Sequence, residues 1–339
     1  MFCFRLRRGN KLSRTQISLG SILLVVAIVA IGMSWVRSQH AAARKQFRTV
    51  TQLRSQSALV LYDYEFDSHN PMFALDREPY SLSSEPQIPK HPPVPDPLIQ
   101  WFGKDLFCGV AHIDMAKHDD ALVRSVFELN DIESIGLGKV DPELVKGLSE
   151  LKRIKRVQFW ETVTPRQVGY AARSPAKVVA FEGSICDGQL LELSKSKAIR
   201  HVFGDAETLE NSFTDQGVES LSKMRQLESL TLNSDRVTPK GLAILERLPN
   251  LRRLKLRLPN ASEGVGRATR GKPLEHLELL DMPINDQTCE VIRTSDSLEY
   301  FHVDLKSNED FSTTRLVNAV KELKNLRTIV IEGGDLTLA

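Results

Sequence analysis

Residues 227–258, LESLTLNSDRVTPKGLAILERLPNLRRLKLRL, determine the fold, because they contain one pattern twice. In each copy apolar residues occupy the first, fourth and sixth positions: Leu227, Leu230 and Leu232, then Leu251, Leu254 and Leu256. Alternating apolar and polar residues are typical of a strand that buries one face. Between the copies, Thr238 and Pro239 precede apolar residues at helical spacing, the pattern of an N-cap followed by a helix. The segment therefore predicts strand, turn, capped helix and strand.

The same unit recurs from residue 110 towards the end of the chain. The middle apolar residues of ten units are separated by 22 to 28 positions. These residues are Ile113, Ile135, Val157, Val179, Val202, Leu230, Leu254, Leu277, Phe301 and Ile329. A period of about 20 to 29 residues is that of leucine-rich repeats. We therefore expect an α/β leucine-rich-repeat solenoid over residues 105–339, with a parallel β-sheet on its concave face and helices on its convex face.

The second half of most units predicts a helix. Candidate helices cover residues 140–151, 163–174, 185–196, 213–224, 237–248 and 284–295. One unit instead contains the Gly-rich residues 262–271. Residues 266–272, GRATRGK, have the spacing of a phosphate-binding loop, but Pro273 stands where a Ser or Thr would ligate magnesium. We expect a loop on the convex side there and no nucleotide.

The N-terminal region contains a candidate membrane anchor. Residues 17–36, ISLGSILLVVAIVAIGMSWV, carry no charge over 20 positions, about the length that a helix needs to cross a bilayer. A cleaved signal peptide is the alternative, but its apolar core is only about 7–15 residues long. We therefore expect a basic tail over residues 1–16 and a single transmembrane helix over 17–36. Five Lys or Arg residues precede the span and five follow it, so orientation rests on the short tail, which favours a cytoplasmic N-terminus and a periplasmic repeat domain.

Charge is distributed unevenly along the 339 residues. Residues 1–54 hold 10 of the 45 Lys and Arg residues and none of the 43 Asp and Glu residues, so the remainder has eight more acids than bases. This distribution excludes a uniformly basic nucleic-acid-binding protein. The four cysteines, Cys3, Cys108, Cys186 and Cys289, have no metal-binding or redox spacing. We expect Cys289 to be buried in the core, no disulfide and no cofactor.

Residues 37–104 connect the span to the repeats. Residues 38–56 are predicted to continue the helix out of the bilayer, and residues 59–66 to form one strand with Tyr62, Tyr64 and Phe66 on one side. Residues 79–97 contain seven prolines, which disfavour both helix and sheet. We expect this run to be an extended linker, with a proline-rich ligand segment as the alternative.

The order of these features resembles the membrane-anchored leucine-rich-repeat proteins of planctomycete bacteria. The likeness rests on the basic tail and apolar span, the strand with Tyr62 and Tyr64, the lead-in of residues 101–110, and helices that begin with a Thr-Asp phrase, as at Thr214 and Asp215. The resemblance implies a tethered solenoid and says little about biochemistry. The repeats are degenerate, because the position five after the strand centre, often Thr or Asn in such proteins, is Thr162 in one unit but Pro259 in another.

Polar and aromatic residues flank each strand centre, at positions that face away from the helices. Exposed Arg, Trp and Tyr are enriched in protein interfaces, so we expect a recognition surface on the concave face. The candidate partner-binding residues are Arg156, Gln158, Trp160, Arg253, Lys255, Arg257, His276, Glu278, Tyr300, His302 and Asp304.

Four of these residues also suggest a metal site. Neighbouring strands lie about 4.8 Å apart, which brings His276 and Glu278 beside His302 and Asp304. A solvated polar surface explains the same residues, and we favour it. We expect no bound metal and no catalytic residues, because the chain has no Ser/His/Asp spacing of a hydrolase.

These observations predict a non-catalytic, membrane-tethered scaffold that binds another protein through its concave sheet. The last strand, residues 326–331, has no helix after it, so pairing of this edge with a second copy or a partner is a further expectation. One alternative is an envelope glycan-binding module, in which Trp160, Tyr300 and Phe203 would stack on sugars. The other is an adaptor of the F-box type, which needs a helical recruiting domain where this chain has the span and the proline run.

Overall fold

The computed structural model describes residues 2–8, 11–17, 19–65, 92, 94–115, 120–129, 131–139, 141–142, 144–204, 212–304 and 313–332. The chain divides into two compact units. Unit 1 comprises Met1–Thr51 and Val94–Cys108, and unit 2 comprises Gln52–Pro93 and Gly109–Ala339. Most of the proline run and Phe66, expected at the end of the strand over residues 59–66, lie outside the described residues.

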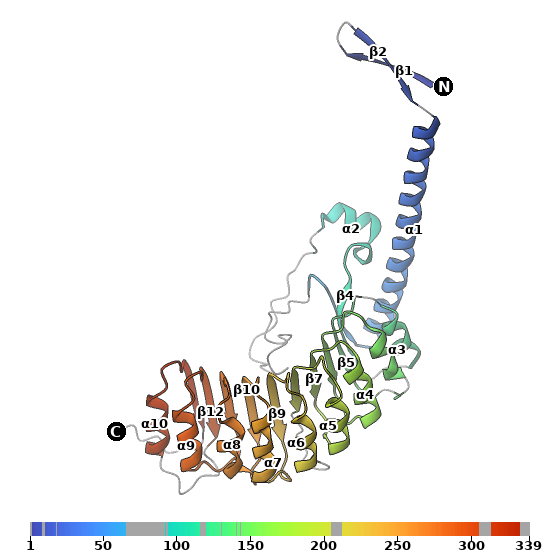
Figure 1. Cartoon of the computed structure of the whole chain (residues 1–339). Helices are drawn as coiled ribbons and strands as arrows, with labels where there is room; N and C mark the ends of the chain where they lie inside the picture. Colours follow the sequence, from blue (N-terminus) through green and yellow to red (C-terminus); the bar gives the residue numbers. More distant parts are fainter. Residues whose placement is uncertain are drawn as a thin grey trace. The chain divides into compact units, whose positions relative to one another are not determined.

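Unit 2 is built on one 11-stranded sheet whose strands follow sequence order from β3 to β13 (Figure 1). β3 (Leu59–Tyr62) runs antiparallel to β4, and the strands from β4 to β13 are parallel to one another. The parallel strands are β4 (Val110–Met115), β5 (Ser134–Leu137), β6 (Arg156–Phe159), β7 (Val178–Phe181), β8 (His201–Gly204), β9 (Ser229–Asn233), β10 (Arg253–Arg257), β11 (His276–Leu279), β12 (Tyr300–Asp304) and β13 (Thr328–Glu332). Each contains one of the ten predicted middle residues.

Helices connect successive parallel strands and cover one face of the sheet (Figure 1). They are α3 (Asp120–Phe127), η2 (Leu144–Glu150), α4 (Pro165–Arg173), α5 (Asp187–Leu193), α6 (Asp215–Leu221), α7 (Pro239–Ala243) with η3 (Ile244–Arg247), η4 (Ser262–Gly264) with α8 (Val265–Thr269), α9 (Asp286–Arg293) and α10 (Thr313–Lys321). The predicted α/β leucine-rich-repeat solenoid is therefore confirmed. We call the face of the sheet that lies away from these helices the concave face.

The core lies between the sheet and the helices. The middle residues of the inner strands point into it, and Ile135, Val157, Leu254 and Phe301 are fully buried. Burying one such side chain contributes roughly 1.5–3 kcal/mol, so the repeated apolar positions stabilise the whole stack. On β13, the last strand of the sheet in the part of the chain that the structure describes, Ile329 remains 41% exposed.

Side chains at the helix starts join neighbouring repeats. Thr164 caps α4 and forms a capping box with Gln167, and Pro165 is the first residue of the helix. This confirms the predicted pattern of an N-cap residue followed by proline. The Thr-Asp phrases make a further connection. Asp215, the first residue of α6, accepts hydrogen bonds from the backbone N–H of Thr238 (2.8 Å) and from its Oγ1 (2.6 Å). Asp187 and Thr214 repeat this pair one unit earlier, with both distances at 2.8 Å.

The Gly-rich unit departs from the prediction of a loop. Residues 262–269 form the two short helical segments η4 and α8 instead. A Cβ atom at Gly264 would lie 2.5 Å from the carbonyl oxygen of Pro239, which is too close for any side chain. Glycine therefore allows η4 to pack directly against the backbone of α7. Gly271, with φ +67°, follows α8, and Pro273 precludes further helix.

The strand before the repeats, predicted over residues 59–66, is also shorter than expected. β3 ends at Tyr62, and Tyr64 lies in the turn of residues 63–65 rather than on the strand. The turn is fixed by Asp63, whose backbone N–H donates to the carbonyl of Gly109 (2.8 Å) while its Oδ2 accepts from the N–H of Gly109 (3.2 Å).

Unit 1 contains a hairpin, a long helix and a short helical segment. β1 (Phe2–Arg8) pairs antiparallel with β2 (Lys11–Ile17), within the region expected to be only a basic tail. The alternation of Phe2, Phe4 and Leu6 with polar residues is the sequence signal for this strand. α1 (Leu19–Ser55) then runs without interruption through the apolar stretch and beyond it. By length and composition α1 could cross a membrane or belong to a signal sequence.

The end of the proline run is helical rather than extended. α2 (Asp96–Phe102) starts inside the run and is followed by η1 (Lys104–Leu106). Pro95 precedes α2 and Pro97 lies in its first turn. Proline is tolerated there because the first N–H groups of a helix have no partner within the helix.

Candidate recognition surface

The parallel register arranges the outward residues of the sheet in rows across the strands. One row runs His112, Ser134, Arg156, Val178, His201, Ser229, Arg253, His276, Tyr300 and Thr328. A second row lies two residues further along each strand and includes Asp114, Gly136, Gln158 and Ala180, then Thr231, Lys255, Glu278, His302 and Val330. The predicted site residues therefore lie in two groups, on β6 and on β10–β12.

The group on β6 is not an exposed stripe. Arg156 is only 2% exposed and Gln158 only 8%, so both differ from the expected outward-facing, solvated residues. Trp160 follows β6, and its indole lies beside Asp114 across Gly136, where a Cβ atom would be 2.5 Å from the indole nitrogen. Strand alternation assigns a side chain to one face of a sheet, but it does not determine whether that face is open to solvent.

Electrostatics in this region reflect the burial. Burial and the neighbouring charge of Arg156 lower the pKa of His112 to about 3, so the imidazole is neutral at physiological pH. Burial also raises the pKa of the Asp114 carboxyl, and the Trp160 indole N–H offsets only part of that effect. These side chains form a buried polar cluster on β4–β6.

Apolar residues continue the buried region onto β7 and β8. Val178, Ala180 and Phe203 form a cluster with exposed fractions of 0%, 1% and 6%. The continuous apolar sequence VVAF of β7 was the available signal, because strands buried on both faces lose their alternation. Phe203 is therefore not an exposed stacking platform.

The group on β10–β12 is accessible to solvent. Arg253, His276 and Tyr300 are partly exposed neighbours in the first row. The rings of His276 and Tyr300 stack, with centroids 4.1 Å apart and planes 2° from parallel. Burial, and then the charge of Glu278, raises the pKa of the Tyr300 hydroxyl, which therefore stays protonated. The three side chains are neighbours in one row that is basic at Arg253 and aromatic at Tyr300.

Glu278 is the centre of the second row. Its Oε1 lies 2.6 Å from Nε2 of His276, and its Oε2 lies 3.8 Å from Nζ of Lys255 and 3.7 Å from Nδ1 of His302. Burial by itself raises the pKa of Glu278, but the hydrogen bond with His276 and the charges of Lys255, His276 and His302 together lower it below its ordinary value. The carboxylate is therefore ionised and ties three strands together.

Two further predicted residues lie at the ends of these strands. Arg257 is exposed and donates from Nε to Oδ2 of Asp281 at 2.6 Å. Asp304 is only 6% exposed, so it does not contribute an open carboxylate beside His302. In the part of the chain that the structure describes, no three His, Cys, Asp or Glu residues are arranged to hold a metal ion.

Sequence reasoning missed two contributors to this surface. Glu332 on β13 extends it, with Oε1 3.4 Å from Nε2 of His302. Asp281 was missed because it follows β11 with φ +49°, a turn geometry that the strand pattern does not reveal. A hydrogen bond between His201 Nδ1 and Ser229 Oγ (2.9 Å) also joins β8 to β9, but both residues are buried, which is consistent with a structural role.

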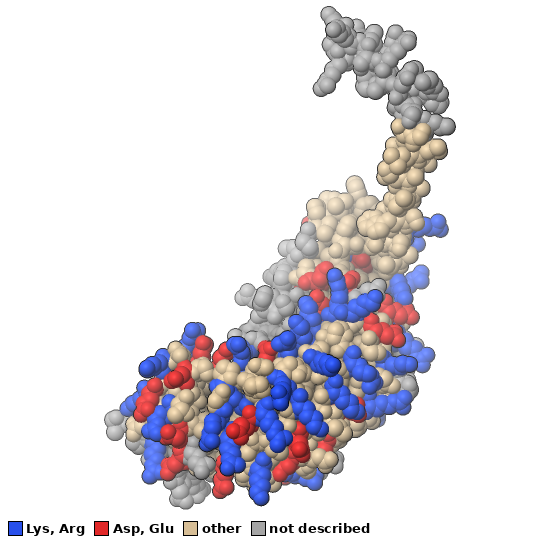
Figure 2. All heavy atoms as spheres, viewed as in Figure 1, with Lys and Arg blue, Asp and Glu red and all other residues tan. Residues whose placement is uncertain are grey.

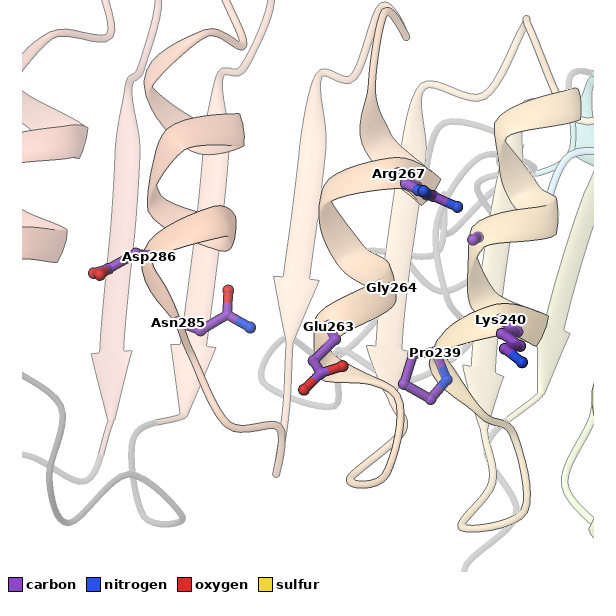
Figure 3. A pocket seen from close by; sticks show the side chains of 8 residues that line it. Pro239, Lys240, Glu263, Gly264, Arg267, Asn285 and Asp286 are labelled. Carbon is purple, nitrogen blue, oxygen red and sulfur yellow. The ribbon is translucent and has the colours of Figure 1, made fainter.

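A separate hollow of about 520 Å³ lies on the helical side, at the start of α7, α8 and α9 (Figure 3). Its lining includes Pro239, Lys240, Glu263, Arg267 and Asp286. It opens where the Asp–Thr connection between repeats is interrupted, because Pro239 occupies the helix position that Asp215 occupies one unit earlier. The charged lining residues are exposed and of both signs, which is typical of a solvated surface (Figure 2).

No family model matches the chain, and no curated protein matches it in sequence. Similar solved structures include the Toll–Spatzle complex of Drosophila, at 13% identity and a TM-score of 0.44, covering 67% of this chain and 31% of that one. An internalin (inlF) from Listeria monocytogenes has 14% identity and a TM-score of 0.37, covering 65% of this chain and 66% of that one. The complex of Rad7 and Elc1 in yeast has 11% identity and a TM-score of 0.39, covering 95% of both chains. At these identities the likeness concerns the fold alone, and the chain spans less than a third of the first structure.

Proposed function

We propose that this protein is a non-catalytic recognition scaffold that binds a protein partner through the concave face of β10–β12. The observation that carries the proposal is the contrast along the sheet: apart from Asp114, the outward residues on β4–β9 are buried, whereas Arg253, His276 and Tyr300, neighbours in one row, remain partly exposed. Arg and Tyr contribute disproportionately to protein interfaces, because each offers a large contact area with a polar group. Arg257, the last residue of β10, has a half-exposed side chain and extends this surface.

The charges of the surface suggest the character of the partner. Arg253, Lys255 and Arg257 project from one strand; Lys255 already lies 3.8 Å from Glu278 and Arg257 donates to Asp281, so carboxylates of a partner would share or replace these acids. A partner segment that presents carboxylates to β10 and an apolar or planar group to Tyr300 would complement this arrangement.

Membrane tethering is the second part of the proposal. α1 carries its apolar stretch immediately after the hairpin, and the side chains of that stretch are exposed, as in Leu24 (62%) and Ile31 (70%). Such a surface is unfavourable in water and favourable in a bilayer. We propose a single-pass protein of the planctomycete membrane-anchored type, with residues 1–16 in the cytoplasm and the repeat domain on the periplasmic side.

Self-association through β13 is a related proposal. Among the described residues β13 is an edge strand with Ile329 exposed, and its sequence TIVIE contains three consecutive apolar residues, so the strand can pair with a copy of itself. Light scattering of the full chain in detergent should show a dimer that Ile331→Lys abolishes, whereas Arg247→Glu on the helical side leaves it intact. A monomer in both cases would contradict this proposal and leave the binding surface unaffected.

Affinity capture from native membranes tests the binding surface. The bait is the full chain or its Arg253→Ala, Arg257→Ala and Tyr300→Ala triple variant. A matched variant replaces three exposed basic residues of the helical side, Lys240, Arg247 and Arg267, by Ala. We expect a partner that is held by the wild type and the matched variant and lost from the concave-face variant. Equal recovery by all three baits would move the site elsewhere, and recovery of glycan alone would favour the envelope-binding alternative.

A further inference from the structure

Unit 1 carries a second apolar surface besides the apolar stretch of α1. It lies on α2 and the residues that follow α2. Four large side chains within ten residues of α2 and its flank are exposed: Leu98 (37%), Trp101 (76%), Phe102 (47%) and Phe107 (37%). Figure 2 shows this segment as a largely uncharged surface. Exposed apolar residues are common singly, but a contiguous group of this size on a small helical segment marks an interaction surface.

Specific contacts fix this segment to one level of α1. The rings of Phe102 and His40 lie 6.0 Å apart between centroids, and Phe102 contacts Phe107 edge-on at 6.4 Å. One turn and a half further along α1, Gln46 Nε2 donates to Oδ1 of Asp105 (3.1 Å) and to the carbonyl of Cys108 (2.7 Å). All of these residues belong to unit 1.

The helix geometry gives the depth of that level. The uncharged stretch of α1 ends at Val36, and a helix rises about 1.5 Å per residue, so His40 lies roughly 6 Å beyond the stretch and Gln46 roughly 15 Å beyond it. The headgroup layer on each side of a bilayer is about 5–7 Å thick. Phe102 is therefore level with the headgroups, while the hydrogen bonds of Gln46 lie on the aqueous side.

We propose that α2 and Phe107 lie in the headgroup layer of the bilayer that α1 crosses, so that a lipid surface covers the exposed aromatic residues. This inference rests on the proposed membrane span. Trp and other aromatic side chains favour the interface, where the ring is buried and a polar group remains hydrated. Arg37, directly after the uncharged stretch of α1, lies at the level of the headgroups and adds attraction to anionic lipids.

Depth-dependent fluorescence quenching tests this placement in the full chain. The chain has three tryptophans, Trp35 at the end of the apolar stretch, Trp101 on α2 and Trp160 in the repeat unit. Variants that keep only one of them, with Phe at the other two positions, are reconstituted into vesicles of phosphatidylcholine and phosphatidylglycerol. The vesicles carry bromine either near the headgroups or near the bilayer centre.

We expect several-fold quenching of Trp101 by bromine near the headgroups and weaker quenching by bromine near the centre. Trp160 serves as the control that neither lipid quenches.

Quenching of Trp35 without quenching of Trp101 would overturn the interfacial segment and leave the membrane span intact. If neither residue is quenched, the span itself is wrong. Protection of Trp101 from aqueous iodide without lipid quenching would indicate a protein covering and would also overturn the proposal. If Trp160→Phe fails to fold, the difference between the wild type and Trp101→Phe reports the same signal.

Discussion

His276 and Glu278 lie two residues apart on β11, and the imidazole Nε2 of His276 is 2.6 Å from Oε1 of Glu278. Both side chains project from the concave side of one strand, because residues i and i+2 of a strand share a face. The other carboxylate oxygen of Glu278 faces Lys255 on β10 and His302 on β12. One acid therefore positions basic groups from three strands, and this arrangement defines the middle of the proposed recognition surface.

Replacing this acid should weaken the C-terminal repeats in a pH-dependent way. The folded-state pKa of Glu278 lies below its ordinary value of 4.5, so the carboxylate stabilises the fold above that value and the contribution is lost as the pH falls through the lowered pKa. We expect Glu278→Gln to reduce the free energy of unfolding by about 1 kcal/mol at pH 7, and by progressively less as the pH falls below 4.5. Hydrogen exchange of β10–β12 in the full chain measures both values. Equal protection of the two proteins at pH 7 would show that the ion pairs contribute nothing.

The Asp–Thr connection between helices should be a measurable source of stability. Asp215→Ala removes two hydrogen bonds to Thr238 and an acid at a helix N-terminus, so we expect a loss of about 1–2 kcal/mol. Glu219→Ala, on the exposed side of the same helix, is the matched control and should change stability by less than about 0.5 kcal/mol. Denaturant unfolding of the full chain in detergent compares the two variants. A similar effect of both would mean that the connection is incidental.

His112 should make the N-terminal repeats sensitive to acid. Its folded-state pKa of about 3 lies below the ordinary 6.5, so below pH 6.5 the unfolded chain binds a proton that the folded chain does not. Stability should therefore fall as the pH decreases from 6.5, by up to about 1.4 kcal/mol per pH unit. We expect His112→Gln to flatten this dependence between pH 6.5 and 5. Thermal unfolding at several pH values decides the matter, and an unchanged slope in the variant would assign the acid sensitivity to another group.

The close approach at the Gly-rich unit should tolerate no side chain. A Cβ atom at residue 264 meets the backbone of Pro239, which cannot rotate away, so Gly264→Ala should destabilise the repeats by roughly 1–3 kcal/mol. Arg267→Ala on α8 is the control, because its side chain is exposed. Denaturant midpoints of the two variants provide the test. If Gly264→Ala is as stable as the control, α7 and η4 can separate without loss.

The sequence was a good guide to the parts of the fold that repeat. The apolar triplets placed every parallel strand from β4 to β13, because Leu230, Leu254 and their equivalents must face one core. Cap residues such as Thr164 placed most helix starts within about two residues, but in the unit predicted over residues 140–151 the structure has a 3-10 helix that begins at Leu144. In the unit around Gly264, the Gly-rich sequence indicated a departure from the other units. It did not predict the two short helical segments that the structure contains there.

The candidate surface was predicted only in part, for a different reason. Alternation put Arg156 and Arg253 on the same face of the sheet, and the register confirms that both lie in one row. Their environments nevertheless differ, since Arg156 is 2% exposed while Arg253 is partly exposed. Solvent access depends on segments distant in the sequence, and no local pattern reports it. The loss of alternation at Val178 and Ala180 was the one indication that this end of the face is buried.

The most direct test of the central claim is site-specific photo-crosslinking in native membranes. A benzophenone amino acid replaces Arg257 or Tyr300 on the concave face, or Arg247 on the helical side as the control, in the full-length protein. The account predicts a discrete adduct with the same partner from positions 257 and 300 and none from position 247. Adducts formed only at position 247, or equally at all three positions, would contradict recognition through the concave face of β10–β12.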